Sequence, residues 1–175
     1  TDDEGARMPW DGKTFGRLKV RGPCVARAYY KDDSDVLDDE GFFDTGDVST
    51  IDRYGYMHVT DRAKDVIKSG GEWISSIELE NLAVGHPKVA EAAVIGVKHP
   101  KWGERPLLVI VPKKDQSATR DEILTFMRGR IASWWMPDEV VFVDEIPHTA
   151  TGKIQKTVLR ERFKDFVLPA AVAVR

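Results

Sequence analysis

The chain has almost no cysteine, since Cys24 is the only one among its 175 residues. A single cysteine excludes an internal disulfide and a cysteine metal cage. It is also typical of a reducing compartment, so the cytoplasm is the expected location. Long apolar runs are missing too: the longest, at 92–97 and 107–111, are far shorter than the roughly 20 residues of a membrane helix. The sequence therefore predicts no transmembrane segment.

A strong excess of charge is also missing. The 26 basic and 29 acidic side chains give a net charge of −3, so nothing favours binding to nucleic acid or to an anionic membrane. The first residues, Thr-Asp-Asp-Glu, include neither an initiator Met nor the apolar segment of a secretory signal. We therefore expect the chain to be a piece of a longer protein.

The distribution of charge predicts two parts. Residues 1–60 hold 13 acidic and 8 basic side chains, whereas 61–175 hold 16 and 18. The first part consists of short extended runs between Gly and Pro, and it contains an acidic cluster from Asp32 and Asp33 to Glu40. The second part alternates strands with helices over a common domain length, which predicts an α+β fold.

Local signals predict the elements of the second part. Residues 56–60 and 64–68 are expected to pair as strands, and a glycine turn follows at 69–72. Ser76 is the expected cap of a helix over 76–84, and Thr119 with Glu122 forms a capping-box pattern that opens a second helix before Pro137. Consecutive apolar residues are typical of central strands, which are expected at 89–97 and 106–111. The prediction is completed by a strand at 139–143, a loop at 146–152 and a basic helix at 154–166.

Three clusters with chemical potential follow one another in order. They are Thr-Gly-Asp at 45–47, Arg-x-Lys-x-x-Ile-Lys-x-x-Gly at 62–71 with 74–80 behind it, and Pro-x-x-x-x-Gly-Lys at 147–153. At these residues the sequence closely resembles the late motifs of the adenylate-forming superfamily, the acyl-CoA synthetases in particular. Asp61 stands where that family usually has a Gly before the Arg. The resemblance covers nearly the whole chain.

The resemblance implies an α+β fold. It assigns residues 61–175 to a small C-terminal lid domain, with a short central β-sheet flanked by helices and a β-hairpin. Residues 1–60 would form the β-rich end of the large adenylation domain. The family's phosphate loop and acyl pocket lie further upstream and are not found in this sequence.

Three of the motif residues are expected to serve the nucleotide and the lid. A carboxylate accepts two hydrogen bonds at once, and the resemblance assigns Asp47 to the ribose of ATP or AMP. The resemblance also directs Arg62 to ribose or phosphate oxygens and makes Lys64 the hinge about which the lid rotates. Taken alone, Asp47 fits a surface Thr-Gly-Asp turn, Arg62 fits an ion pair with Asp61 or Asp65, and Lys64 fits a solvated lysine.

Lys153 is the expected catalytic residue. Transfer of a carboxylate to the α-phosphate of ATP builds negative charge, which a fixed ammonium stabilises, and the resemblance assigns this work and an ATP contact to Lys153. The alternative is an ordinary lysine that precedes a basic helix. The resemblance further implies that the pantetheine arm of coenzyme A lies along a glycine-containing segment. Alternatively, this segment forms only a tight hairpin turn, and its Trp73 packs in the core. This segment is Ser69, Gly70, Gly71, Glu72 and Trp73.

Other candidates receive no role. The four histidines have no metal-ligand spacing and are expected on the surface or in loops, so no metal site is predicted. Glu161 and Asp165 interrupt the basic residues of the last helix, which indicates a solvated face rather than a nucleic-acid surface. Trp134 and Trp135 are expected in a core or a domain interface. The histidines are His58, His86, His99 and His148.

Together these features predict the C-terminal part of an ATP-dependent acyl-CoA synthetase, which is an acid–thiol ligase. The resemblance implies ATP with Mg²⁺, coenzyme A, and a fatty or related carboxylic acid as substrates. The isolated chain is expected to be inactive. Two alternatives stay open, namely a free-standing module that docks on a partner and a lid that loads a carrier protein. No carrier domain is visible at 168–175, so coenzyme A is the preferred acceptor.

Overall fold

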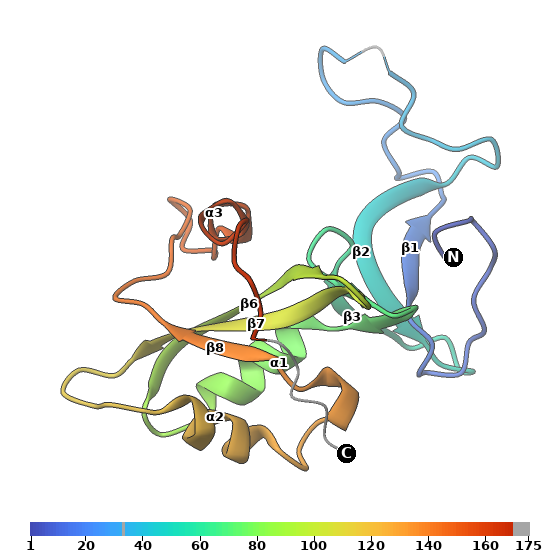
Figure 1. Cartoon of the computed structure of the whole chain (residues 1–175). Coiled ribbons are helices and arrows are strands. Elements are labelled where there is room, and N and C mark those ends of the chain that lie inside the picture. Colours follow the sequence, from blue (N-terminus) through green and yellow to red (C-terminus); the bar gives the residue numbers. More distant parts are fainter. Residues whose placement is uncertain (33, 170–175) are drawn as a thin grey trace. The chain divides into compact units, whose positions relative to one another are not determined.

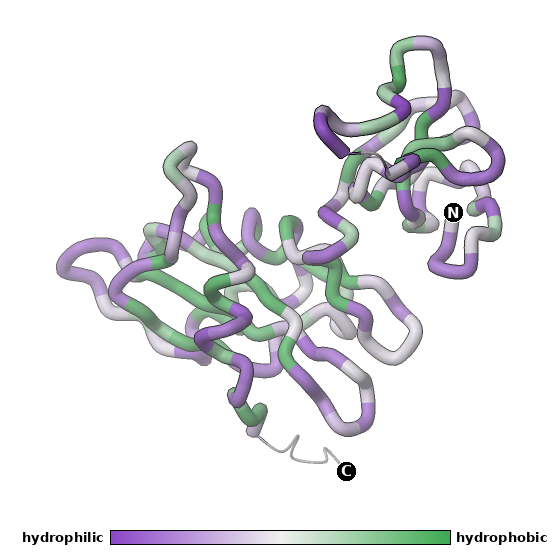
Figure 2. Tube along the Cα trace, turned by 90° about the horizontal axis from the view of Figure 1, so that it is seen from above, coloured by the Kyte–Doolittle hydropathy of each residue, from purple (hydrophilic) through white to green (hydrophobic). Residues whose placement is uncertain are grey.

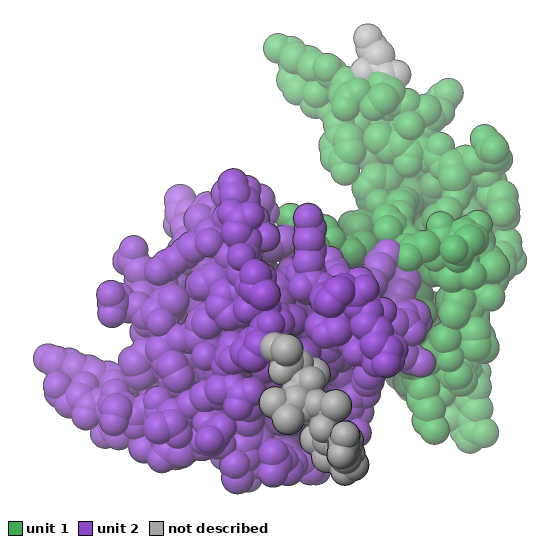
Figure 3. Space-filling model, in the orientation of Figure 1, with its two compact units in different colours: residues 1–64 green, residues 65–175 purple. Residues whose placement is uncertain are grey.

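The computed structural model describes residues 1–32 and 34–169. Asp33 of the acidic cluster and residues 170–175 of the terminal segment lie outside this description. The chain forms two compact units, unit 1 at Thr1–Lys64 and unit 2 at Asp65–Arg175 (Figure 3). Each unit has its own sheet, so the two are described separately.

Unit 1 is built on a three-stranded antiparallel sheet. Strand β2 (Phe43–Ile51) lies between β1 (Gly16–Val20) and β3 (Met57–Arg62), and its Val48 is fully buried. The expected pairing of 56–60 with 64–68 is wrong, because β3 pairs with β2 instead. A tight turn explains this choice: the Asp52 carboxylate accepts the N–H groups of Tyr54 and Tyr56 and turns the chain directly back along β2.

Unit 2 is an α+β domain, as expected (Figure 1). Its sheet has the order β5-β4-β7-β6, and β8 runs parallel to β7. A short 3₁₀ helix, Ser133–Trp135, precedes β8. The strands are β4 (Ile67–Ser69), β5 (Glu72–Ile74), β6 (Val89–His99), β7 (Gly103–Pro112) and β8 (Glu139–Phe142), and the helices are α1 (Ser76–Val84), α2 (Arg120–Met127) and α3 (Lys156–Arg162).

Helices cover both faces of this sheet. In Figure 1, α1 and α2 lie on one side of it and α3 on the other. Val94 and Leu108 contribute to the core under α1 and α2, whereas Ile95 and Leu107 contribute to the core that includes Leu159 of α3. Apolar residues accordingly follow one another without alternation at 92–95 and 107–111, and the trace in Figure 2 contains such apolar runs. Burial on both faces explains why neighbouring strand residues are all apolar.

The prediction that 89–97 and 106–111 are both central strands is half right. β7 is central, but β6 lies at the edge of the sheet. Its apolar run reflects cover on its two faces rather than a neighbour on each side. At the open edge, the Glu80 side chain of α1 reaches over and its Oε1 accepts the Val94 N–H at 2.8 Å.

One of the two predicted helix caps is confirmed, and the other is displaced by one residue. Thr119 and Glu122 form both bonds of the predicted capping box at α2. The cap of α1 is Ser75 rather than Ser76, because the Ser75 hydroxyl accepts the Glu78 N–H. Among the described residues, no helix combines the length and apolar character that crossing a membrane requires.

The last helix is shorter than the predicted 154–166. α3 covers only Lys156–Arg162, because Ile154 forms a β-bridge with His148 and Phe163 already leaves helical geometry. Phe166 turns back so that its ring packs edge-on against that of Phe163, with centroids 6.0 Å apart. Apolar packing of this terminal segment replaces the last expected turn of helix.

Candidate functional site

Strands β2 and β3 bring Asp47 and Arg62 together in unit 1. The two residues are cross-strand neighbours, and Arg62 Nη1 lies 2.9 Å from Asp47 Oδ1. The Asp47 side chain is 24% exposed and that of Arg62 is 55% exposed, so the pair is open to solvent on one side. Arg62 Nη1 also donates to the Thr45 carbonyl at 3.4 Å. A carboxylate and a guanidinium thus form one polar site at the end of the hairpin.

The Thr-Gly-Asp segment is held by its own turn bonds. The Thr45 hydroxyl donates to the Leu18 carbonyl of β1 and accepts the Asp47 N–H. Gly46 has a φ of 72°, which favours glycine, and its carbonyl accepts the Ala63 N–H at 2.9 Å. These bonds tie the Asp47 backbone to β1 and to the end of β3, so its carboxylate has a defined position.

Asp44 supports the same turn. Burial raises the pKa of its carboxyl, but the Gly46 N–H at 2.8 Å and the Arg17 guanidinium at 2.6 Å outweigh burial, and the pKa lies below its usual value. Asp44 is therefore an ionised structural partner within unit 1. Asp44 precedes the Thr-Gly-Asp motif, and no motif in the sequence marks its role.

Asp61, which replaces the family's usual Gly, is buried in β3. Its Oδ1 accepts the backbone N–H of Arg62 at 2.8 Å. The carboxylate therefore bonds locally to the backbone of the residue whose side chain pairs with Asp47. Lys64, the predicted hinge, is exposed and is the last residue of unit 1.

Ser69 to Trp73 span the β4–β5 hairpin of unit 2, in which Gly70 and Gly71 form the turn. Gly70 and Gly71 have φ values of 60° and 89°, a backbone that favours glycine. Ser69 is buried, Gly70, Gly71 and Glu72 are exposed, and Trp73 is half-buried, with Lys68 Nζ 5.2 Å from its ring centroid. The predicted segment is thus the tip of one hairpin, whose two turn glycines have an accessible backbone.

Two tryptophans pack beneath this turn. The Gly70 N–H donates to the Trp102 carbonyl at 2.9 Å, and the rings of Trp102 and Trp134 meet edge to face with centroids 4.8 Å apart. Trp134 and Trp135 also pack against the core under α1 and α2, as expected. The buried Arg105 of β7 binds the same segments, although it belongs to none of the three sequence motifs. A lone arginine among apolar strand residues was the signal that could have found it.

Lys153 lies on an exposed loop that ends in an ordered β-bridge. Thr149 holds the loop: its N–H donates to the Lys153 carbonyl at 2.8 Å, and its hydroxyl accepts the Lys153 N–H at 3.1 Å. Gly152, with a φ of 80°, makes the turn. Ile154 continues the bridge to His148 instead of opening the helix. In residues 1–32 and 34–169, no carboxylate lies within ion-pair distance of the Lys153 ammonium.

The helix after this loop is anchored by two ion pairs. Lys156 Nζ lies 2.7 Å from Glu80 Oε1 of α1 and donates to the Ser76 hydroxyl at 2.6 Å. Arg160 pairs with Asp65, the first residue of unit 2. Both basic residues were expected on a solvated helix face, but they are partners of carboxylates that are largely buried. α3 therefore links the Lys153 loop to α1 and to the start of unit 2.

Each histidine lies in a loop or is at least partly exposed, as predicted, although the loop residue His86 is buried. His58 and His148 are exposed and His99 is half-buried, but His86 is buried after α1. Its ring packs edge-on against Phe126, and its Nδ1 accepts the Lys88 N–H at 3.2 Å. Its role in the structure is to close the end of the helix.

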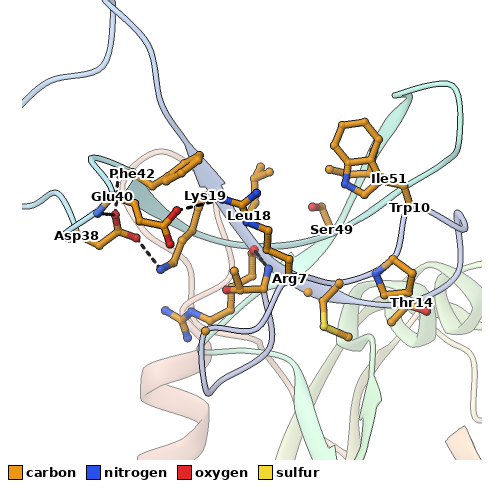
Figure 4. Close-up of a pocket in the computed structure, with 16 residues that line it drawn as sticks. Arg7, Trp10, Thr14, Leu18, Lys19, Asp38, Glu40, Phe42, Ser49 and Ile51 are labelled. Carbon is orange, nitrogen blue, oxygen red and sulfur yellow. Dashed lines mark hydrogen bonds and ion pairs between the residues drawn. The ribbon is translucent and has the colours of Figure 1, made fainter.

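Unit 1 also contains a cavity of about 260 Å³ that no predicted residue lines. Trp10, Leu18 and Ile51 supply apolar walls, as Figure 4 shows. The Lys19–Asp38 ion pair at 2.8 Å lies at its side. The predicted residues therefore fall into three places: the Asp47–Arg62 pair in unit 1, and the glycine turn and the Lys153 loop in unit 2.

Comparison with known proteins gives a consistent result. The family model for the AMP-binding enzyme C-terminal domain matches residues 78–153. The 3-methylmercaptopropionyl-CoA ligase of Ruegeria pomeroyi is 57% identical over 165 residues, which are 94% of this chain and 30% of that enzyme. The medium-chain-fatty-acid–CoA ligase of Ectopseudomonas oleovorans is 46% identical over 173 residues, 99% of this chain and 32% of that enzyme.

A solved structure agrees with these relatives. ATP-bound MatB from Rhodopseudomonas palustris superimposes with a TM-score of 0.80 and 36% identity, covering 93% of this chain and 33% of that one. This chain thus spans about a third of the length of the proteins it matches. The resemblance inferred from the motifs and the expected α+β fold are both confirmed.

Proposed function

We propose, because this chain belongs to the AMP-binding, adenylate-forming enzyme family, that it is the C-terminal part of an ATP-dependent acyl-CoA synthetase. Such an enzyme works in two steps. A carboxylate first attacks the α-phosphate of ATP, which gives an acyl-adenylate and releases pyrophosphate. The thiol of coenzyme A then attacks the acyl carbon, which gives the thioester and releases AMP.

The observation that carries the proposal is the Lys153 ammonium. It stands on an exposed, hydrogen-bonded loop, and no carboxylate of the described residues neutralises it. The hydrogen bonds fix the backbone of Lys153, and its exposed ammonium is free of a carboxylate partner among the described residues, so it is available to a phosphate on which negative charge develops. Phosphoryl and adenylyl transfer depend mainly on such positioned cations. Lys153 is therefore the proposed catalytic residue of adenylation and a contact to ATP.

The Asp47–Arg62 pair suits the nucleoside part of the same substrate. The carboxylate is partly exposed and has a second oxygen for the adjacent hydroxyls of a ribose. The contacts of the Arg62 guanidinium within the described part of the chain use Nη1, and its fork has further donors for ribose or phosphate oxygens. Asp47 and Arg62 are the proposed ATP and AMP ligands.

Lys64 and the glycine turn are assigned to the second step. Lys64 is exposed at the boundary between the two units, where a change in backbone angles would reorient unit 2. We propose that this motion exchanges the Lys153 loop for Ser69 to Trp73, whose accessible glycine backbone then lines the path of coenzyme A. In this scheme residues 1–60 are the end of the large adenylation domain and 61–175 are the lid.

The names of two relatives support the proposed substrate class. They are called 3-methylmercaptopropionyl-CoA ligase and medium-chain-fatty-acid–CoA ligase, so we propose a fatty or related carboxylic acid. Mg²⁺ would accompany ATP and neutralise part of its phosphate charge. We keep the cytoplasm as the proposed location, because the single Cys24 is a free thiol.

Half-reaction assays on the natural protein that contains this chain test the proposal. The wild type should exchange labelled pyrophosphate into ATP in a carboxylate-dependent way. Lys153→Ala should lower this rate about 100- to 1,000-fold, the usual cost of removing one charge-stabilising donor, and should spare thioester formation from supplied acyl-adenylate. Lys164→Ala is the matched control, because that lysine is exposed just after α3 and pairs only locally with Glu161.

The reciprocal variant is Lys64→Pro. It should spare exchange and abolish thioester formation, because proline restricts the backbone at the proposed hinge. If Lys153→Ala and Lys64→Pro lose both half-reactions to the same extent, the assignment of two lid positions is wrong. Robust exchange by residues 1–175 alone would refute the proposal that the chain is only the C-terminal part of the enzyme.

A further inference from the structure

Arg105 is a charged residue at a place where charge is rarely found. It lies in the central strand β7 and is only 6% exposed. A buried guanidinium persists only where its donors are satisfied. Its partners therefore indicate what this residue stabilises.

These partners come from two segments of unit 2 outside β7. Arg105 Nε and Nη2 both bind Asp138 Oδ1, at 2.8 Å and 2.7 Å. Nη1 donates to the Trp134 carbonyl at 2.9 Å and contacts the Ser69 hydroxyl at 3.3 Å, while Nη2 donates to the Met136 carbonyl at 3.0 Å. One side chain thus joins β7, the segment 134–138 and the end of β4.

This network meets the glycine turn directly. Ser69 is the residue before Gly70, and the Arg105 guanidinium carbon lies 4.7 Å from the centroid of the Trp134 ring. That ring packs against Trp102, whose carbonyl accepts the Gly70 N–H. A methyl group on Gly70 would lie only 2.8 Å from the Trp102 ring, so the turn fits closely onto the two tryptophans. The position of the turn therefore depends on the position of both rings.

We propose that Arg105 is a positioning residue for thioester formation, holding the Ser69–Gly71 backbone in the conformation that coenzyme A meets. This inference rests on the proposed function. It assigns Arg105 no contact with substrate, because the guanidinium is buried beneath the turn. Adenylation depends on the Lys153 loop, to which Arg105 makes no hydrogen bond, and it should be insensitive to this residue.

The planar guanidinium of Arg105 is what allows one side chain to bind all of these partners. Arg105 uses three nitrogens at fixed angles to bind Asp138, Ser69 and two carbonyls at once. The single ammonium of a lysine keeps the charge but cannot satisfy that set. Arg105→Lys therefore loosens the turn while it keeps the charge that Asp138 requires.

The test uses the natural protein and measures the two half-reactions separately. Arg105→Lys should leave carboxylate-dependent pyrophosphate exchange within about twofold and raise the KM for coenzyme A about 10- to 100-fold, the scale expected when a binding surface is misplaced by an ångström or less. Arg120→Lys is the matched control and should change neither value. Arg120 binds Glu139 and the Asp138 carbonyl through a similar fork, but at the surface.

Four outcomes are decisive. An unchanged KM for coenzyme A in Arg105→Lys, or an equal loss of exchange and thioester formation, would overturn the inference and leave Arg105 a purely structural residue. If Arg105→Lys does not fold, Asp138→Asn removes only one arm of the network and should still raise that KM selectively; no selective rise overturns the inference. If the wild type itself shows no exchange, the proposed function fails, and the role of Arg105 fails with it.

Discussion

A single methyl group on each glycine of the β4–β5 turn tests how that turn is built. At Gly70 the new Cβ would lie 2.8 Å from Trp102 Cε3, 3.3 Å from its Cζ3 and 3.4 Å from Trp134 Cζ2. At Gly71 no atom lies within 4 Å of the new Cβ. Both glycines have positive φ, so Gly71→Ala is a matched control for backbone strain.

The expected loss in free energy of unfolding is larger for Gly70→Ala than for Gly71→Ala, because only the Cβ at position 70 meets a ring. An alanine in the left-handed region costs about 1 to 2 kcal/mol, and this applies to both variants. Overpacking against a rigid ring adds about 1 to 3 kcal/mol, and this applies only to Gly70→Ala. The free energy of unfolding should therefore fall by about 2 to 5 kcal/mol in Gly70→Ala and by about 1 to 2 kcal/mol in Gly71→Ala.

Urea unfolding followed by far-ultraviolet circular dichroism measures both changes as shifts in midpoint at constant m-value. Trp102→Leu supplies a second check, because a smaller side chain makes room for the methyl group. In the Trp102→Leu variant, Gly70→Ala should lower the free energy of unfolding by no more than Gly71→Ala does, and a double-mutant cycle measures this difference. Equal destabilisation by the two alanines in the wild-type background would refute the close fit of Gly70 onto the tryptophans.

Two further predictions concern carboxylates. The pKa of Asp44 is lower in the folded protein, so its contribution to stability is present above the unfolded pKa and is lost as the pH falls through the folded one. Asp44→Asn should flatten the dependence of the urea midpoint on acid pH, and an unaltered profile would contradict this. Glu80→Gln removes the partner of Lys156, whose side chain is 10% exposed, and should lower the free energy of unfolding by about 1.5 to 3 kcal/mol. Glu78 lies on the exposed face of α1, so Glu78→Gln should lower the free energy of unfolding by less than about 1 kcal/mol in the same urea experiment. Equal decreases for the two variants would contradict a stabilising role of the buried Glu80–Lys156 pair.

Local signals in the sequence predicted the elements that depend on near neighbours. Thr119 and Glu122 lie three residues apart, so their capping box needs only one helical turn to form. The turn around Gly70 and Gly71 is equally local. The ordered motifs made the family recognisable, because they depend on residue identity and spacing rather than on the fold.

Long-range contacts account for the elements that were wrong. β3 pairs with β2 rather than with residues 64–68, and that choice depends on packing that no short window contains. β6 is an edge strand although its composition is that of a central one. Arg105 was overlooked because its partners, Ser69 and Asp138, lie 36 and 33 residues away. Composition reveals burial, but not which distant atoms a buried donor will meet.

The carboxylate on the edge of β6 has a consequence for biosynthesis. An apolar strand with unpaired N–H groups is a template on which a second chain can add, and edge strands are therefore a common origin of aggregates. α1 precedes β6 in the sequence, so Glu80 leaves the ribosome before Val94 does. The nascent chain thus carries the group that blocks this edge before the edge exists. A residue that stabilises the folded unit also limits association of unfinished chains.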